Sequence, residues 1–520
     1  DTSTEAFFSK KDQTRIDYDR FREQFGRDEI VLALIHPKKV FELKFLEKLK
    51  AFHEDLEEEV PHLDEVQSLI NVTSMRGEEG ELIIEELMEN WPEDDKGIRE
   101  LKDRVLRNKY YRNFLVSEDG EYTTVVVRSN AFSDYSQGMD QDQMLADGFE
   151  EDEGSPIAGD DKPRLLTEKQ NSEFVVAIQS LADRHHSEDF PIDLGGSPVM
   201  VHDLKKAMFT DMPVFMLSSL GVISLLLVIL FRRLSGLVLP LLTVIFSLLT
   251  ALGLVAATGT KLTIILQILP SFLLAVGIGY SMHLLVIYYR HLRDHGDKGE
   301  AIAYAMGHSG LAILITSLTT AGGLLSFAPV KVAPVSDLGL FGAAGVIFCV
   351  SFTLVLLPAL LSVLPEGKHA VAEENLYLRK NHRTRYSFAD RMLKGCGDFA
   401  VNSPWTVIGI SILIALMSSF GASQLRFSHN PVAWLPEDNS LRSATDSINK
   451  HMKGSAAIEL VVEREEENAV KEPEFMNRLD EFNHFSEGTS HKKISVGKSS
   501  SIVDVVKEIN QVLNEDNEKY

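Results

Sequence analysis

Apolar residues gather in the middle of the chain, and charged residues gather in the regions on either side. Five stretches in the middle, and a sixth after a polar linker, approach or exceed the roughly 20 apolar residues that a helix needs to cross a bilayer. These stretches are residues 213–231, 237–257, 264–289, 311–327, 338–364 and 405–421. A soluble core would instead need five consecutive helices that are apolar on every side. The pattern therefore predicts membrane spans.

Basic residues indicate how these spans are oriented. Arg232 and Arg233 follow the first stretch, and Arg290, Arg293 and Lys298 follow the third. The linker after the fifth stretch adds Arg379, Lys380, Arg383, Arg385, Arg391 and Lys394, whereas the alternate turns carry one lysine each. Cytoplasmic loops are enriched in Lys and Arg. We therefore expect the basic turns in the cytoplasm and both charged flanking regions on the opposite side.

This pattern divides the chain into five segments. We expect a first periplasmic domain at residues 1–210, a five-span membrane block at 211–365, and a cytoplasmic linker at 366–403. Within that linker, residues 386–399 fit an amphipathic helix along the inner leaflet. A further span at 404–424 then leads to the start of a second periplasmic domain at 425–520. Because the chain begins at Asp1 and stops in an unfinished domain, we expect it to be a fragment.

The first flanking region alternates strand and helix patterns. We predict strands at 30–35 and 66–72, a helix at 39–60, and a hairpin formed by 112–117 and 122–128. A helix at 167–184 and a strand at 190–194 follow. This order predicts a split βαβ, ferredoxin-like α+β sandwich.

A weak internal repeat links the two flanking regions. Five apolar positions recur at an offset of 430: Phe45, Leu46, Leu49, Phe52 and Val66 return as Phe475, Met476, Leu479, Phe482 and Val496. Residues 30–34 similarly match 458–462. Chance similarity of two amphipathic units is the alternative. Because transporters are often built from repeated halves, we expect a span before Asp1 and a second membrane block after Tyr520.

Charge and chemistry narrow the classes of function. The formal net charge of −24 argues against nucleic-acid binding, which needs clustered Lys and Arg. The two cysteines, Cys349 and Cys396, lie in or after the apolar block, so we predict no disulfide in the charged regions. The sequence has no Walker A motif, nucleophile elbow or spaced metal-ligand set. We therefore expect no enzyme activity, no metal and no cofactor.

One span, a large outer domain and five further spans, all duplicated, resembles the plan of the resistance–nodulation–division (RND) superfamily. The most specific stretches are Ala-Val-Gly-Ile-Gly-Tyr-Ser-Met-His-Leu-Leu at 275–285 and Thr-Ser-Leu-Thr-Thr-Ala-Gly-Gly at 316–323. With Glu-Ala-Ile at 300–302 and Gly-Gly-Ser-Pro at 195–198, they resemble the hydrophobe-exporter branch. That branch includes the mycobacterial large membrane proteins and the bacterial hopanoid and sterol exporters. The five-span unit is also similar to the sterol-sensing domain of eukaryotic lipid transporters.

The resemblance implies an inner-membrane RND transporter fold and export of a lipid-like substrate. In this family, proton entry through carboxylates in the fourth and tenth spans often drives transport. A periplasmic lipid-binding partner fits this plan, and a homo-oligomer is compatible with it. Two other functions stay open, which are a lipid sensor without transport and an accessory to protein export.

The chain departs from the family pattern where the fourth-span carboxylate is expected. Tyr280 and Gly279 occupy the two positions where the family commonly has Asp, and none of the second to fifth apolar stretches contains a charged residue. A charge at the bilayer centre costs about 3 kcal/mol, so charges are kept there when they serve a function. The remaining candidates for ion coupling are His283, Tyr280, Ser281, Thr316, Thr319 and Thr320.

Two interpretations of these residues remain open. His283 could relay protons, since an imidazole titrates near neutral pH, with the hydroxyls as its path. Alternatively, the hydroxyls bond backbone carbonyls and serve helix packing, and small residues let the helices approach closely. The glycines expected to do so are Gly277, Gly279, Gly322 and Gly323.

Soft apolar side chains gather at the predicted outer mouth of the first span. They are Met208, Phe209, Met212, Phe215 and Met216. Met and Phe form adaptable apolar surfaces that suit lipid tails. We therefore take them as candidates for a substrate path, with an ordinary interfacial anchor as the alternative.

Overall fold

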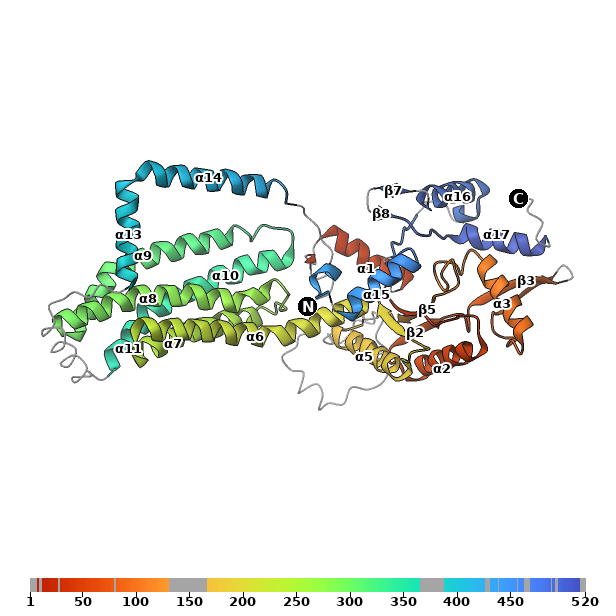
Figure 1. Cartoon of the computed structure of the whole chain (residues 1–520), viewed down its shortest axis with the longest axis horizontal. Coiled ribbons are helices and arrows are strands. Elements are labelled where there is room, and N and C mark those ends of the chain that lie inside the picture. Colours follow the sequence, from red (N-terminus) through yellow and green to blue (C-terminus); the bar gives the residue numbers. More distant parts are fainter. Residues whose placement is uncertain are drawn as a thin grey trace.

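The computed structural model describes most of the chain in several stretches. They are residues 7–8, 12–26, 29–78, 81–130, 166–364, 388–425, 431–437, 439–455, 457–462, 468–487, 489–491 and 494–514. Figure 1 shows an elongated molecule with a helical bundle at one end and a mixed α/β domain at the other.

Six helices of the described residues are long and apolar enough to cross a membrane. They are α6 (Ser197–Phe231), α7 (Leu234–Ala257), α8 (Leu269–His295, preceded by the 3₁₀ turn η2, Leu266–Ile268), α9 (Lys298–Leu325), α10 (Ala333–Ser351) with its continuation, and α14 (Pro404–Ala422). Each predicted apolar stretch coincides with one of these helical segments to within two residues at its ends or lies inside it, so the expectation of six membrane-length helices is confirmed. We call α6–α11 the helical bundle.

The first span is much longer than its apolar stretch. Helix α6 has 35 residues and passes through Pro213 without a break. Its first turns contact β1, β6 and α5 of the α/β domain, and its later part packs on α7 and α8. The polar residues before Pro213 are therefore helical because they rest on the α/β domain, a contact that apolar length alone could not predict.

Helix α8 forms the centre of the bundle. It packs against α7, α9 and α10, and Leu269, Leu273, Leu284 and Leu285 are fully buried in it. After Ser351, helix α10 widens into one π-helical turn, η3 (Phe352–Leu356), and continues as α11 (Leu357–Val363). Pro358 explains this widening, because a proline has no N–H to donate and its ring clashes with the carbonyl four residues earlier.

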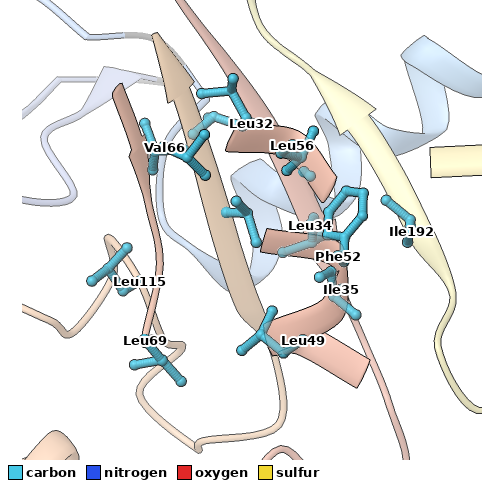
Figure 2. Packing of buried hydrophobic residues seen from close by; sticks show 14 of the residues in the cluster. Leu32, Leu34, Ile35, Leu49, Phe52, Leu56, Val66, Leu69, Leu115 and Ile192 are labelled. Carbon is cyan, nitrogen blue, oxygen red and sulfur yellow. The ribbon is translucent and has the colours of Figure 1, made fainter. Parts of the chain in front are cut away.

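The α/β domain is built on a four-stranded sheet. Its strands are β1 (Ile30–Ile35), β2 (Leu63–Gln67), β5 (Thr123–Ser129) and β6 (Ile192–Gly195), in the order β2-β5-β1-β6 with every neighbouring pair antiparallel. Helices α2 (Leu43–Glu59) and α5 (Glu168–His185) pack on each other and against the sheet. In Figure 2, Leu49, Phe52 and Leu56 of α2 lie against β1 and Ile192. The apolar periodicity of the sequence therefore located this core.

Other elements of this domain were not predicted. They are α1 (Gln13–Phe25), α3 (Asp95–Arg107), and the hairpin of β3 (Thr73–Glu78) and β4 (Glu81–Glu86). The strand predicted at 66–72 lies instead at β2, because the Asn71 side chain bonds Val66 and Ser68 to close a turn. Residues 112–117 form tight turns on the carbonyl of Tyr111 rather than a regular strand. The predicted hairpin is present in part, because the Ser117 N–H donates to the Tyr122 carbonyl, the Thr124 N–H donates to the Leu115 carbonyl, and Val116 bridges to Thr123.

The rest of the described chain forms two further parts. Helix α13 (Phe388–Asn402) lies across the helix direction of the bundle and leads into α14 (Figure 1). No side chain of α14 is buried, and nearly all of them are exposed. A C-terminal lobe follows, with η4 (Pro431–Trp434), α15 (Ser440–His451), η5 (Ala469–Lys471), α16 (Pro473–Glu487), β7 (Ser490–His491), β8 (Ile494–Ser495) and α17 (Ile502–Leu513).

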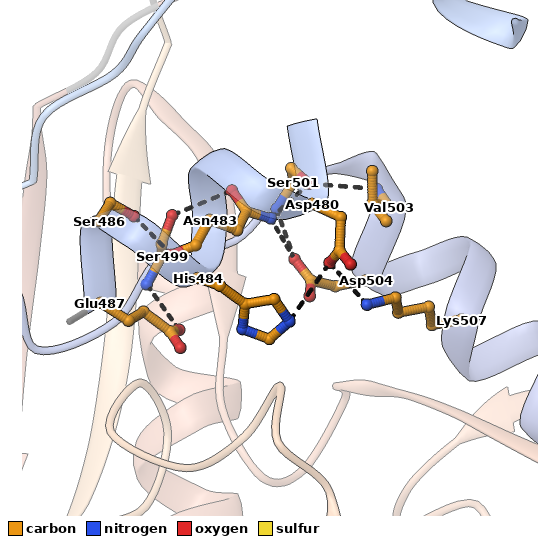
Figure 3. A network of polar contacts seen from close by, with 10 residues as sticks. All are labelled: Asp480, Asn483, His484, Ser486, Glu487, Ser499, Ser501, Val503, Asp504 and Lys507. Atoms are coloured by element: carbon orange, nitrogen blue, oxygen red, sulfur yellow. Dashed lines mark hydrogen bonds and ion pairs between the residues drawn. The ribbon is translucent and has the colours of Figure 1, made fainter. Parts of the chain in front are cut away.

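The C-terminal lobe has its own polar centre. The Asn483 amide on α16 donates to the Ser501 hydroxyl at 2.7 Å and to Asp504 at 3.3 Å, at the start of α17 (Figure 3). Lys507 adds an ion pair with Asp480 at 2.6 Å. These contacts join α16 to α17. Ile458, the counterpart of Ile30 in the predicted repeat, is 87% exposed, and the described residues 457–462 form no strand.

Candidate functional site

Three buried hydroxyls form a continuous line through the centre of the bundle. The Thr243 oxygen on α7 lies 3.2 Å from the Ser281 oxygen on α8, which lies 3.4 Å from the Thr353 oxygen in η3. All three side chains are at most 1% exposed. We call Thr243, Ser281 and Thr353 the hydroxyl chain. It is the only described place where side-chain hydroxyls of three bundle elements meet.

Backbone carbonyls complete the hydrogen bonding of this chain. The Thr243 hydroxyl donates to the Pro240 carbonyl at 2.8 Å, and the Ser281 hydroxyl reaches the Gly277 carbonyl at 3.1 Å. Each hydroxyl has one proton and two acceptor sites. Ser281 can therefore donate either to its own helix or to Thr243 and accept from Thr353. The chain can change the direction of its hydrogen bonds by rotating hydroxyls, without moving a helix.

The predicted ion-coupling residues on α8 lie on different sides of that helix. Ser281 is in the hydroxyl chain, whereas His283 two residues later is exposed on the outer side of the bundle. Successive helical residues are turned by about 100°, so two residues apart point in nearly opposite directions. Tyr280 is buried; its hydroxyl has no hydrogen-bond partner among the described residues, and Thr320 is the hydroxyl near it.

The predicted threonines of α9 bond their own helix. Thr316 donates to the Ala312 carbonyl at 2.7 Å, and Thr319 and Thr320 donate to the Thr316 carbonyl at 2.9 and 2.8 Å. Thr316 and Thr319 are exposed, so the structure does not gather them with Ser281. This arrangement matches the interpretation in which hydroxyls bond backbone carbonyls.

Of the four predicted packing glycines, Gly277 lies at a tight helix contact. A Cβ atom on Gly277 would lie 2.8 Å from Val244 of α7 and 3.0 Å from Cys349 of α10. No atom would lie within 4 Å of a Cβ on Gly279, Gly322 or Gly323. Gly345 of α10, which was not singled out from the sequence, instead packs on Leu273, 2.6 Å from where its Cβ would be.

One carboxylate, which precedes the apolar stretch predicted at 338–364, lies inside a membrane-length helix. Asp337 belongs to the second turn of α10, where it is half-buried, and no hydrogen bond or ion pair of its side chain occurs among the described residues. Pro334 at the first turn could have revealed this, because proline favours the start of a helix. Asp337 is therefore an acidic candidate for the site that the length of the apolar stretches did not indicate.

The candidate substrate path on α6 does not converge on one pocket. Phe209 and Phe215 are 62% and 63% exposed, whereas Met216 packs against the bundle core. Gln267 of η2 donates to the Met208 carbonyl at 3.0 Å and ties α6 to the start of α8. Met212 is half-buried. These five side chains therefore line both an outward surface and a helix contact.

Outside the membrane helices, α15 of the C-terminal lobe packs apolar side chains into the core of the α/β domain, and polar contacts surround this junction. The His451 ring stacks on Tyr122 with centroids 3.8 Å apart, and Lys453 pairs with Glu118. Asn108 donates to Glu508 at 2.8 Å. Burial raises the pKa of the Glu508 carboxyl, and Asn108 partly opposes this shift. Burial also lowers the pKa of Lys498 to about 8.

Comparison with known proteins supports a membrane transport family. A model of the MMPL family matches residues 165–391, from α5 to the first turn of α13. The putative membrane protein MJ1562 of Methanocaldococcus jannaschii is 24% identical over 67% of this chain and 80% of its own length. The mycolic acid-containing lipids exporter MmpL11 of Mycolicibacterium smegmatis is 25% identical over 42% of this chain. The hopanoid transporter HpnN of Rhodopseudomonas palustris is 28% identical over 24% of it.

These matches confirm the resemblance to the hydrophobe-exporter branch of the RND superfamily. The matched regions cover 22% of MmpL11 and 14% of HpnN, so this chain spans less than a quarter of either protein. The matches centre on the helical bundle and its connection to α5. The chain is thus a largely helical membrane protein whose bundle is similar to that of transporters.

Proposed function

We propose that this chain is part of an RND-type secondary transporter that exports a hydrophobic, lipid-like molecule from the inner membrane toward the periplasm or outer membrane. The single observation that carries the proposal is the unbroken course of α6 from the α/β domain into a bundle that matches the MMPL family. Two relatives named for lipid and hopanoid transport support the substrate class.

Helix α6 suits a mechanical link between the two parts. At about 1.5 Å per residue it is about 50 Å long, whereas the bilayer core is about 30 Å thick. Its first turns rest on β1 and β6, and its last part rests on α7 and α8. A shift of the bundle helices therefore moves the α/β domain directly. Exposed Phe209 and Phe215, near the point where α6 leaves the membrane, provide apolar surface for a lipid tail.

The orientation and the fold of the outer parts belong to the same proposal. The basic turns after α6 and α8 lie at the end of the bundle away from the α/β domain (Figure 1), which supports a periplasmic α/β domain in a bacterial inner membrane. The strand order β2-β5-β1-β6 supports a ferredoxin-like sandwich. Helix α13, with exposed Met392 and Phe399, suits the inner leaflet.

For ion coupling, we propose that the bundle uses hydroxyls where other family members use a carboxylate. The hydroxyl chain and Tyr280 occupy the buried side of α8, while His283 contributes from its exposed side. Asp337, half-buried in the second turn of α10, is the carboxylate that we include in this proposal. Gly277 keeps α7 and α10 close to α8, so the hydroxyls stay within hydrogen-bond distance.

A lipid sensor is the second candidate. It is favoured by the lack of charged side chains in α7 and in α8 before Arg290. A sensor needs lipid binding but no ion gradient, whereas a secondary transporter needs both. The two functions therefore differ in their response to a proton gradient.

Purification with native lipid followed by reconstitution distinguishes them. We expect mass spectrometry to find one lipid class enriched over the bulk membrane, and that lipid to move across proteoliposomes faster when a pH gradient is imposed. Enrichment without gradient-dependent movement supports the sensor. Bulk lipid composition together with no movement contradicts both functions.

A further inference from the structure

Four aromatic rings stack in a row at the end of the bundle away from the α/β domain. Their order is His295, His291, Tyr304, His308, with the first two on α8 and the last two on α9. The ring centroids are 4.0, 4.3 and 5.7 Å apart along the row, and neighbouring rings are parallel within 19°. Three of the four rings are imidazoles, so the row concentrates titratable groups at one helix contact.

His291 is the buried member of this row. It is 8% exposed, whereas His295, Tyr304 and His308 are exposed. Its Nε2 atom forms no hydrogen bond with any described residue, and the nearest carboxylate oxygen, on Glu300 of α9, lies 3.5 Å away. A buried polar atom without a partner costs stability unless something supplies one. A proton on His291 would convert this contact into an ion pair between α8 and α9.

We propose that His291 is a proton-binding site that joins the ends of α8 and α9. A proton placed there is stabilised from two directions. Glu300 provides the opposite charge, and the face of the Tyr304 ring stacks on the imidazolium as a cation–π partner. Positive charges on both His291 and His295 would repel each other, because the centroids of these stacked rings are 4.0 Å apart.

The other charged groups around the site have their own partners. Arg293 pairs with Asp294 at 3.2 Å, and Asp297 caps α9 through the backbone of Glu300 at 2.6 Å. Lys298 donates to the carbonyls of Ser362 and Leu364 at the end of α11. Glu300 is therefore left as the acidic group within ion-pair distance of His291.

Two more arginines lie near this end of α8, Arg233 just before α7 and Arg290 on α8 itself. Arg233 at the start of α7 lies over the Tyr289 ring at 5.5 Å, and Arg290 is exposed. Both raise the local positive potential, which opposes a proton on either imidazole. Glu300 and the Tyr304 ring are therefore the groups that favour a proton on His291.

A proton on His291 affects how tightly α8 and α9 pack, because this residue lies where the two helices meet. Helix α8 also carries Ser281, and α8 and α9 pack along their length. Protonation adds an attraction between α8 and α9 at the loop that joins them. Loss of the proton leaves the stacking alone, so the loop end loosens.

Hydrogen–deuterium exchange of the full chain in nanodiscs tests the site without relying on transport. Exchange at residues 288–304 is compared at pH 8 and pH 5.5, with labelling times scaled for intrinsic exchange. We expect protection to increase several-fold at pH 5.5. Glu300→Gln and His291→Gln should both abolish this increase. Glu300 is exposed, so its variant keeps the fold even if the His291 variant does not.

His308→Asn is the matched control, since it removes the ring at the end of the row that does not contact His291. This variant should retain the increase in protection. The proposal is overturned if the wild-type chain shows no increase, or if Glu300→Gln keeps it. It is also overturned if protection is greater at pH 8 and a chelator removes it, because a metal ion held by neutral imidazoles would then be the ligand.

Discussion

The hydroxyl oxygens of Thr243 and Ser281 lie 3.2 Å apart between α7 and α8, and both side chains are buried within the bundle. Each already has a backbone carbonyl within reach, so packing alone does not require the pair to meet. The contact, continued by Thr353, makes a polar line that joins α7, α8 and η3 inside the bundle. The first prediction follows from it.

Replacing Ser281 with Ala removes the middle of the hydroxyl chain. We expect a loss of about 1 kcal/mol in unfolding free energy, the usual value for one buried hydrogen bond. We expect the rate of gradient-driven transport to fall by much more than this loss of unfolding free energy can explain. Ser247→Ala is the control, because Ser247 is also buried and bonds the Thr243 carbonyl at 2.7 Å. Equal transport losses in both variants, measured in proteoliposomes, would contradict a role for the chain.

Replacing Gly277 with Val should separate helices that now touch. Its Cβ would lie 2.8 Å from Val244 and 3.0 Å from Cys349, and overpacking of this kind costs about 1–3 kcal/mol. We expect a lower thermal midpoint in detergent, partly restored by adding Val244→Ala. Gly279→Ala meets open space, so it should be neutral or stabilising by up to about 1 kcal/mol, as expected for Gly to Ala in a helix. Equal effects at both positions would show that Gly277 is not a packing contact.

Asp337 and His283 offer two different titratable groups for ion coupling. We expect Asp337→Asn to lower gradient-driven transport at least tenfold while expression and lipid binding persist, because the amide keeps the shape but cannot carry charge. His283→Ala tests the relay proposed for the exposed side of α8 in the same assay. If both variants transport at the wild-type rate, the ion path of this bundle uses neither residue.

The junction between the α/β domain and the C-terminal lobe should respond to pH through Glu508. Its carboxyl has a raised pKa in the folded chain, so the protonated form is favoured there. Its contribution to stability is present at low pH and is lost as pH rises through the unfolded value toward the folded one. Glu508→Gln keeps the acceptor for Asn108 and removes the charge. We expect a higher thermal midpoint at pH 7 and a smaller difference at pH 4.

A midpoint for Glu508→Gln that is raised equally at both pH values would mean that packing rather than charge is responsible. Asn108→Ala serves as the comparison at this junction. It removes the donor at 2.8 Å and leaves the carboxylate half-buried. That variant should be less stable than wild type at pH 7.

Much of the α/β core followed from local patterns. The strand predicted at 30–35 matches β1 in full, and the buried face of α2 contains the apolar residues at helical spacing, Phe45, Leu46, Leu49, Phe52 and Leu56. The β3–β4 hairpin was missed because its residues are mostly polar and Ile84 is 59% exposed. The sequence there has no alternation of apolar and polar residues that would indicate a strand. The turns at 112–117 were missed because they depend on hydrogen bonds to one carbonyl.

The candidate site, like the α/β core, was predicted only in part. Ser281 was singled out from the sequence, but its partners Thr243 and Thr353 were not. They lie 38 and 72 residues away along the chain, so no local spacing connects them. Asp337 fell outside the predicted fifth span because the bounds of that span were set by its apolar residues. The backbone becomes helical earlier, at Ala333.

By itself, the sequence determined which segments are membrane-length helices, because a bilayer accepts only long apolar stretches whose backbone bonds are internal. It also determined that the bundle carries few charges. The tertiary structure decided which polar atoms meet. The π turn before Pro358, the close approach at Gly277 and the crossing of α8 with α9 place hydroxyls and imidazoles from distant segments side by side. Such contacts depend on packing in three dimensions, which helical periodicity along one chain does not specify.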